Sequence, residues 1–127
     1  MPQQQQHAPR VLVVDDEPDI CAVMADALEP EGYEVTCFTD PRKAIEHVGR
    51  HGAEVALIDL VMPSGEQAGA AVVERAARLG VRVIVMTGAL DAADRLQALP
   101  PHRHLAKPFR VADLLNLVRG ALAAAAA

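Results

Sequence analysis

Short apolar runs alternate along this chain with longer stretches in which apolar residues recur at helical spacing. The short runs indicate buried strands, and the helical recurrence indicates helices that pack one face against a core. Strands are expected at residues 10 to 15, 33 to 38, 54 to 60, 81 to 87 and 102 to 106, with a helix after each. This alternation predicts an α/β fold of five βα units around a parallel sheet.

Capping and breaking residues set the limits of the second and third helices. Asp40 is suited to the N-cap of the second helix, which Gly49 and Gly52 should end. A loop through Gly69 is expected to lead into a third helix over about 70 to 79.

The last two helices are expected on either side of the fifth strand. A short fourth helix should begin at Asp91, and a fifth should run from Phe109 to about Ala123. The inward stripe of the first helix is expected to include Val23, and that of the fifth Val111. The closing alanines should extend the fifth helix, because alanine has the highest helix propensity.

Length and composition fit one folded unit. A chain of 127 residues with 51% hydrophobic and 23% charged residues is typical of one globular domain. We expect a disordered lead-in at 1–9, a folded domain at 10–123 and an alanine tail at 124–127. No apolar stretch approaches the roughly 20 residues needed to cross a bilayer, so a soluble protein is expected.

The N-terminal segment and the two cysteines favour a cytoplasmic location. The first ten residues are polar and lack the apolar core of a secretory signal. Cys21 and Cys37 are far apart in sequence, which suits a reducing compartment, and both are expected to be inert, small core residues. A formal charge of −5 with only three aromatic residues argues against direct nucleic-acid binding.

Four of the predicted strands end on side chains that can handle a phosphoryl group or a metal ion. Asp15 and Asp16 follow the first strand, and Asp59 ends the third. Thr87 and Lys107 stand at the ends of the fourth and fifth. Parallel strands bring their carboxyl ends to one edge of the sheet, where open α/β folds place ligand sites, so these five side chains are expected to share a pocket.

Three carboxylates in one pocket require a cation, because an unpaired buried charge is costly. Ligands that are oxygen atoms only suit Mg²⁺, with Mn²⁺ as a substitute, better than zinc, which prefers His or Cys. The three acids, the ammonium of Lys107 and one divalent cation cancel in formal charge. A carboxylate can then form an aspartyl phosphate, since phosphoryl transfer depends mainly on positioning and on nearby cations.

Four segments of the chain resemble the receiver domain of two-component response regulators. They are VLVVDDE at 11–17, ALIDLVMP at 56–63, VMTG at 85–88 and LAKPF at 105–109. They occur in the family's order and span residues 10 to about 122. The resemblance implies a flavodoxin-like (CheY-like) doubly wound fold, with five parallel strands in the order 2-1-3-4-5 and five flanking helices.

The resemblance also implies an acceptor and a metal site. Asp59 is the expected phosphoacceptor, which takes a phosphoryl group from a histidine kinase or a histidine phosphotransfer protein. Asp16, Asp59 and the Val61 carbonyl are the expected direct Mg²⁺ ligands, and Asp15 is expected to act through water. Such a domain is an autocatalytic acceptor rather than a classical enzyme.

Two further residues of the pocket are implied to hold the phosphoryl oxygens. These are Thr87, which also acts as a switch residue, and Lys107. In this family the bond between the lysine and the following proline, here Pro108, is often cis.

The chain departs from the family pattern at positions beside the site. His104 stands where the family usually has Tyr or Phe, and it is expected either to be a half-exposed residue of an edge strand or to serve as a titratable switch. Val61 and Ala89 flank the site with side chains that cannot orient a water, so they are expected to set the lifetime of the aspartyl phosphate. The loop after Pro63 is also altered.

The output and the partners are only broadly constrained. The family's usual partner surface, the fourth helix, fifth strand and fifth helix, corresponds to about residues 91 to 122 and would engage a downstream protein. No output domain follows it, so the chain is either a stand-alone receiver or a fragment cut before an effector. A monomer or weak homodimer is expected, with no membrane partner.

Three other functions are weighed against the receiver. One is a phosphate-independent receiver that acts as an interaction module. Another is a small Mg²⁺-dependent phosphatase or phosphotransferase, but Val61 stands where a second acid would be expected. A nucleotide- or flavin-binding module is disfavoured, because the first βα loop is acidic where a phosphate cradle would be rich in glycine.

Overall fold

The secondary structure alternates between strands and helices, as the apolar pattern predicts. The computed structural model describes residues 8–60, 62, 66–88 and 96–126. In chain order its elements are β1 (Arg10–Val14), α1 (Pro18–Leu28), the 3-10 helix η2 (Glu29–Glu31), β2 (Glu34–Phe38), α2 (Pro41–His51), β3 (Val55–Asp59), α3 (Glu66–Arg78), β4 (Arg82–Thr87), β5 (Arg103–Ala106) and α5 (Val111–Ala126).

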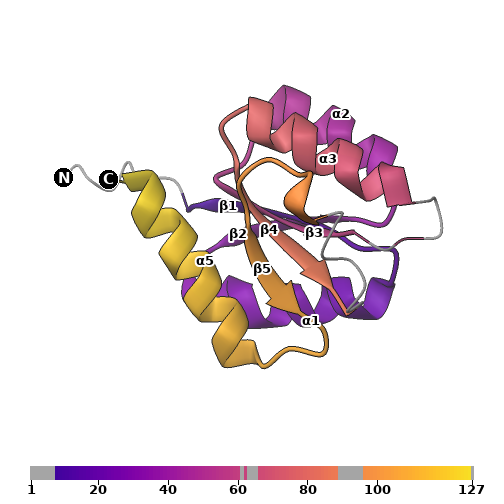
Figure 1. Ribbon diagram of the computed structural model, residues 1–127. Coiled ribbons are helices and arrows are strands. Elements are labelled where there is room, and N and C mark those ends of the chain that lie inside the picture. Colours follow the sequence, from indigo (N-terminus) through magenta and orange to yellow (C-terminus); the bar gives the residue numbers. More distant parts are fainter. Residues whose placement is uncertain (1–7, 61, 63–65, 89–95, 127) are drawn as a thin grey trace.

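The five strands form one parallel sheet in the order β2-β1-β3-β4-β5, which confirms the expected topology (Figure 1). Strand β1 lies between β2 and β3, so the strand order reverses direction at β1. At this switch point Val14 pairs with Phe38 in β2 and with Ile58 in β3. In doubly wound sheets the crevice beyond such a point is the usual place for a ligand.

Helices cover both faces of the sheet, and the strand residues alternate between the two layers. Helices α2 and α3 lie on one face, and α1 and α5 on the other (Figure 1). In β1, Leu12 and Val14 pack with the α2 and α3 side, while Val11 and Val13 pack with the α1 and α5 side. Because both faces are covered, the three central strands β1, β3 and β4 are nearly continuous apolar runs, whereas the outer strands β2 and β5 also carry polar residues.

The second helix begins as predicted, and of the two glycines expected to end it only the second does so. The Asp40 carboxylate accepts a hydrogen bond from the Arg42 backbone N–H at 2.9 Å, which is an N-cap. Gly49 lies inside α2, so its expected role as a helix end was wrong. Gly52 ends the helix, and its φ of 68° is a backbone conformation that favours glycine.

The third helix starts at Glu66, four residues before its expected start, and Gly69 lies within it rather than in a loop. The reason is the packing of α3 against the end of β3. A Cβ atom at Gly69 would lie 2.8 Å from the Asp59 carbonyl oxygen and 3.0 Å from the Leu60 Cα. The glycine therefore marks close approach between helix and strand, not a break in the helix.

The helices on either side of β5 differ from expectation in extent and count. Helix α5 continues to Ala126, so the alanines do extend it. Residues 91 to 95, where the fourth helix was expected to begin, lie outside the described residues. The part of the chain that the structure describes has four α-helices rather than five.

Two valines that were expected to point inward are exposed. Val23 on α1 is 44% exposed and Val111 at the start of α5 is 47% exposed. Both line an apolar groove of about 410 Å³ beside Lys107 and Pro108. Each therefore contributes to a groove wall and not to the core.

The two cysteines form a disulfide that joins α1 to β2. Cys21 and Cys37 are 16 residues apart in sequence, and their Cα atoms lie 5.9 Å apart. That spacing lies within the ordinary range for a disulfide. The expectation of two inert, reduced thiols was therefore wrong, because packing of α1 on the sheet brings together residues that their sequence positions keep apart.

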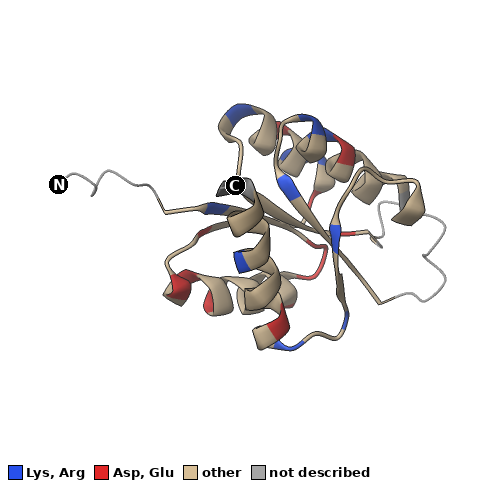
Figure 2. Ribbon diagram, turned by 60° about the vertical axis from the view of Figure 1, so that its left-hand side comes forward, with Lys and Arg blue, Asp and Glu red and all other residues tan. Residues whose placement is uncertain are grey.

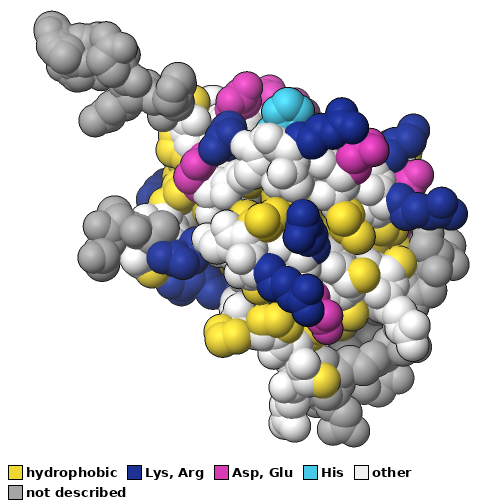
Figure 3. Space-filling model, turned by 90° about the horizontal axis from the view of Figure 1, so that it is seen from above, with side chains coloured by type: hydrophobic (Ala, Val, Ile, Leu, Met, Phe, Trp, Pro, Cys, Tyr) yellow, Lys and Arg dark blue, Asp and Glu magenta, His cyan; other side chains and the backbone are white. Residues whose placement is uncertain are grey.

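The two helical layers differ in charge. Figure 2 shows acidic residues on α1, which has no basic residue, and several basic residues on α2 and α3. From above, the basic side chains are interspersed with acidic and apolar ones (Figure 3). Mixed signs of this kind are typical of a solvated face. No helix among the described residues is long and apolar enough to cross a membrane.

Candidate functional site

The sheet register brings the predicted site residues to one edge. Strand β1 ends at Val14 beside Ile58, so Asp15 and Asp59, which follow these two residues, emerge at the same level of neighbouring strands. Asp59 is in turn paired with Met86, the residue before Thr87. Thr87 pairs with Ala106, the residue before Lys107. The four strand ends therefore converge as the sequence predicts.

Three carboxylates form a compact cluster at this edge. One oxygen from each of Asp15, Asp16 and Asp59 can be chosen so that all three lie within 4.8 Å of one another. Asp15 is fully buried and Asp59 is 4% exposed, while Asp16 is partly exposed. Negative charges at this spacing and burial repel strongly unless a cation lies among them.

Lys107 supplies one positive charge to the cluster. Its Nζ atom lies 2.8 Å from Asp15 Oδ2 and 3.2 Å from Asp59 Oδ2, and 3.8 Å from Glu17 Oε1. Burial acts to lower the pKa of the Lys107 ammonium, but the hydrogen bond that it donates to Asp15 and the charge of Asp59 outweigh it, so the pKa is raised. The lysine is therefore held in its charged form.

Asp15 is fixed by contacts to both of its carboxylate oxygens and to its backbone. Oδ1 accepts a hydrogen bond from the Glu17 N–H at 2.9 Å, and Oδ2 accepts one from Lys107. Its own backbone N–H donates to the Phe38 carbonyl at 3.1 Å. Both oxygens already have partners, which distinguishes Asp15 from a carboxylate directed only at a ligand.

Sequence reasoning assigned no role to Glu17 or Gly69. Glu17 faces Lys107 at 3.8 Å but is largely exposed, so it adds a weak, screened charge. Its position directly after Asp16 could have indicated that Glu17 lies near the acidic site. Gly69 lets the first turn of α3 lie against the Asp59 backbone, and a glycine in a helical stretch can indicate such a contact.

Thr87 and Lys107 are linked through their backbones. Thr87 is the last residue of β4 and is 2% exposed. Its carbonyl accepts a hydrogen bond from the Lys107 N–H at 3.1 Å. The bond between Lys107 and Pro108 is cis, which agrees with the family expectation. The hydroxyl and the ammonium are thus carried on adjacent strands at the same edge.

The remaining predicted residues lie beside or beyond this cluster. His104 is exposed on β5, which pairs with β4 alone and is an edge strand. Its placement agrees with an exposed edge residue and does not test a switch role. Val61, with its carbonyl, and Ala89 lie outside the described residues, as do residues 63–65 of the altered loop.

The donor set fits a hard divalent cation. The cluster offers carboxylate oxygens only, and its members come from two rigid strand ends with one side partly open. Mg²⁺ prefers oxygen ligands and keeps several waters, which a small, partly open acidic cluster permits. Among the described residues, no His or Cys, which zinc prefers, joins the cluster.

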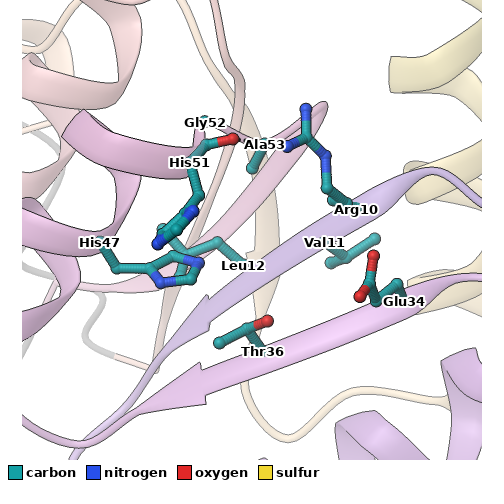
Figure 4. Close-up of a pocket in the computed structure, with 9 residues that line it drawn as sticks. All are labelled: Arg10, Val11, Leu12, Glu34, Thr36, His47, His51, Gly52 and Ala53. Atoms are coloured by element: carbon teal, nitrogen blue, oxygen red, sulfur yellow. Dashed lines mark hydrogen bonds between the residues drawn. The ribbon is translucent and has the colours of Figure 1, made fainter. Parts of the chain in front are cut away.

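A second hollow lies at the opposite end of the strands, about 190 Å³ in volume (Figure 4). Its walls include Arg10, Glu34 and the rings of His47 and His51, whose centroids are 4.8 Å apart. Arg10 forms an ion pair at 3.1 Å with Glu54. The hydrogen bond between this pair raises the pKa of Arg10 and lowers that of Glu54, so the charge here is already balanced.

Comparisons with known proteins agree with this geometry. The family described as response regulator receiver domain matches residues 11–119. The sensory transduction protein RegX3 of Mycobacterium bovis is 31% identical over 115 residues, which cover 88% of this chain and 50% of that protein. The transcriptional regulatory protein PrrA of Mycobacterium tuberculosis is 30% identical over 117 residues, covering 91% and 50%. The chain thus spans about half the length of these relatives.

A solved structure shares the fold closely. A CheY-like response regulator receiver domain protein from Methanospirillum hungatei superposes with a TM-score of 0.80 at 28% identity, covering 90% of this chain and 93% of that one. Receiver domains are signalling modules that generally use Mg²⁺ at an acidic site and work with histidine kinases. The strand-end acids, the lysine and the matched family together show that this chain belongs to the response regulator receiver domains of two-component signalling.

Proposed function

We propose that Asp59 accepts a phosphoryl group from the phosphohistidine of a histidine kinase or a histidine phosphotransfer protein, in a Mg²⁺-dependent reaction. The observation that carries this proposal is the convergence of three carboxylates and Lys107 at the end of β1 and β3. A carboxylate oxygen of Asp59 attacks phosphorus, the N–P bond to the imidazole breaks, and the histidine leaves. The product is an aspartyl phosphate.

Lys107 and Thr87 stabilise the transferred group. The raised pKa of Lys107 keeps the ammonium charged. The ammonium can therefore move from the Asp59 carboxylate to a phosphoryl oxygen and pair with it. Thr87 carries a hydroxyl at the end of the adjacent strand, and its donation to a phosphoryl oxygen is the switch movement that the resemblance implies. Phosphoryl transfer gains mainly from such positioned charges and donors.

Asp16, Asp59 and the Val61 carbonyl would hold Mg²⁺, with Mn²⁺ as a substitute, and Asp15 would act through water. Both Asp15 oxygens already accept a hydrogen bond, and the contact of Oδ2 with Lys107 competes with direct binding of a cation, which supports this division. When bound, the cation supplies positive charge next to the phosphoryl oxygens. The charges of the three acids, Lys107 and the cation would then cancel, and one Asp59 oxygen would remain able to react.

The chain is proposed to be the acceptor in a relay rather than an enzyme for external substrates. Residues 10–123 act as the receiver unit in the cytoplasm, as a monomer or weak homodimer. The face formed by residues 91–122 signals to a downstream protein. The apolar groove that contains Val23 and Val111 adjoins Lys107, and so offers a partner a surface next to the reacting carboxylate.

The central test is phosphorylation by a small donor. The chain is incubated with acetyl phosphate and Mg²⁺, and its intact mass is measured; one added phosphoryl group is expected. Asp59→Asn should abolish the added mass, whereas Asp40→Asn, which alters an exposed helix cap, should leave it unchanged. An unmodified wild-type chain, or a modified Asp59→Asn chain, would reject the proposal.

The lifetime of the phosphate tests the flanking positions. Val61 and Ala89 are proposed to set how readily water reaches the aspartyl phosphate. Polar substitutions at both positions should change the rate of phosphate loss, measured after the donor is removed. An unchanged lifetime would mean that other groups position the water.

His104 is proposed to change environment on phosphorylation. Its place on the edge strand β5, three residues before Lys107, leaves its imidazole accessible to an NMR titration. Titration with and without a phosphoryl mimic should give different His104 shifts. Identical titration curves would reject a switch role for this residue.

A further inference from the structure

The disulfide between Cys21 and Cys37 lies close to the backbone of Asp15, one member of the acidic cluster. Cys21 is the fourth residue of α1, and Cys37 is the penultimate residue of β2. Both residues are partly buried and pack against the core on the α1 and α5 side of the sheet. Their bond ties the helix that follows the acidic loop to the strand beside it.

Both ends of this bond connect to the backbone of Asp15. The Cys21 sulfur lies 3.9 Å from the Asp15 carbonyl oxygen. Next to Cys37, the Phe38 carbonyl accepts the hydrogen bond from the Asp15 N–H at 3.1 Å. Asp15 thus lies between the two elements that the disulfide joins, and its carboxylate is the one that Lys107 contacts at 2.8 Å.

A second connection runs through the first turn of α1. The Cys21 N–H donates to the Glu17 carbonyl at 3.3 Å, and the Glu17 N–H donates to Asp15 Oδ1 at 2.9 Å. Any shift of Cys21 is therefore passed to the side chain of Asp15 as well as to its backbone. Packed elements move as units, so the shift is not absorbed locally.

We propose that Cys21 and Cys37 form a reversible thiol–disulfide site whose state sets the position of Asp15, and through it the Mg²⁺ affinity and the phosphoryl acceptance of the acidic cluster. The part of the proposal that concerns phosphoryl acceptance rests on the proposed function of Asp59. The co-reactant is a second disulfide, of the kind formed by glutathione-type thiols.

The exchange step balances. On oxidation each cysteine gives up a proton and one electron, and the two sulfurs bond to each other. The two electrons and two protons pass to the second disulfide, which leaves as two thiols. On reduction the same steps run in reverse, and two small thiols become a disulfide.

The direction of the effect follows from which state holds the site together. Reduction removes the covalent link between α1 and the end of β2, so the two elements that flank Asp15 are no longer tied to each other. The arrangement in which all three acids lie within 4.8 Å is that of the disulfide form. Reduction should therefore weaken Mg²⁺ binding and slow phosphoryl acceptance.

The test compares one polypeptide in two redox states. The full chain is equilibrated in buffers of oxidised or reduced glutathione, and alkylation followed by mass spectrometry reports whether the bond is present. Mg²⁺ affinity is then measured by calorimetry, and the rate of phosphoryl gain from acetyl phosphate by intact mass. Both should be at least about fivefold greater in the oxidised form, the lower end of usual coupling between two sites.

Cys37→Ser supplies the matched control. This variant cannot form the bond, although its remaining Cys21 thiol can carry glutathione as a mixed disulfide. In samples that intact mass shows to be free of bound glutathione, its Mg²⁺ affinity should be the same in both buffers and should match that of the reduced wild type. Since the comparison of the two wild-type states needs no substitution, an unstable variant does not remove the test.

Three outcomes would overturn the proposal. They are failure of the bond to form in oxidised glutathione, equal Mg²⁺ affinities in the two states, and a redox effect that persists in Cys37→Ser. If neither state gains a phosphoryl group, the proposed acceptor function fails, but the ratio of Mg²⁺ affinities still decides the redox proposal.

Discussion

The two ends of the sheet carry ionisable groups in opposite arrangements. At the carboxyl end, Asp15 and Asp59 are buried with Lys107 as their cation, and acidic charge is in excess. At the amino end, Arg10 and Glu54 are partly exposed and neutralise each other. A hollow of about 190 Å³ lies at the amino end (Figure 4). Burial combined with unbalanced charge, rather than cavity shape, therefore distinguishes the candidate site in this molecule.

The sharpest contrast between the ends should come from removing each cation. Lys107→Met leaves two buried carboxylates without their counter-charge and should lower the free energy of unfolding by about 3 kcal/mol in the absence of divalent cations. Arg10→Met breaks an ion pair that water already screens and should cost less than about 1 kcal/mol. Urea unfolding in the presence of a metal chelator measures the free energy of unfolding of both variants. Equal losses would contradict the contrast.

The disulfide should be the next largest contributor, and it belongs to the carboxyl end. A bond that closes a loop of 16 residues restricts the unfolded chain, so Cys37→Ser should lower the free energy of unfolding by about 3 kcal/mol. Thermal unfolding of wild type with and without a reductant provides the comparison. A reductant that lowers the midpoint of the variant as much as that of wild type would contradict this prediction.

Two glycines inside helices should respond in opposite directions to the same substitution. Gly69→Ala places a Cβ atom 2.8 Å from the Asp59 carbonyl oxygen, so α3 must shift and stability should fall by roughly 1 to 3 kcal/mol. Gly49→Ala meets only the end of the Arg75 side chain, at 3.4 Å, and should gain roughly 0.5 to 1 kcal/mol from helix propensity. Urea unfolding checks both. Similar changes in the two variants would show that the close approach is unimportant.

The smallest effect should be a pH dependence at the amino end. Burial, with the charges of His51 and Arg10, lowers the pKa of His47 in the folded protein. The unfolded chain therefore binds a proton first, and stability should fall as the pH drops from about 6.5 through the lower folded pKa. His47→Gln should flatten this slope. The free energy of unfolding lost over this pH range should then differ from that of wild type by less than about 1 kcal/mol. Equal slopes in urea unfolding at several pH values would contradict the assignment.

Strand ends were predictable from sequence because two independent signals agree there. The buried strands are continuous apolar runs, and each run stops at a polar residue. Parallel pairing then requires Asp15, Asp59, Thr87 and Lys107 to share an edge. The order of the sheet followed from the resemblance of four segments to receiver domains rather than from periodicity.

Features that depend on packing between elements were not predictable in the same way. Nothing local to Cys21 or Cys37 indicates that α1 will bring them within bonding distance. Gly69 looks like a loop residue until the approach of α3 to β3 is known. Val23 and Val111 fit an inward stripe, yet they line a groove beside Lys107 and Pro108. Each of these needs the relative placement of two elements, which a single sequence stretch does not hold.

The most direct measurement locates the phosphoryl group. After reaction with acetyl phosphate and Mg²⁺, the chain is reduced with borohydride, which converts an aspartyl phosphate to homoserine, and its peptides are mapped by mass spectrometry. We expect homoserine at position 59 alone, with Asp15 and Asp16 unchanged. Homoserine at position 15 or 16, or a phosphoryl group carried on a histidine, would contradict the assignment of Asp59 as the acceptor.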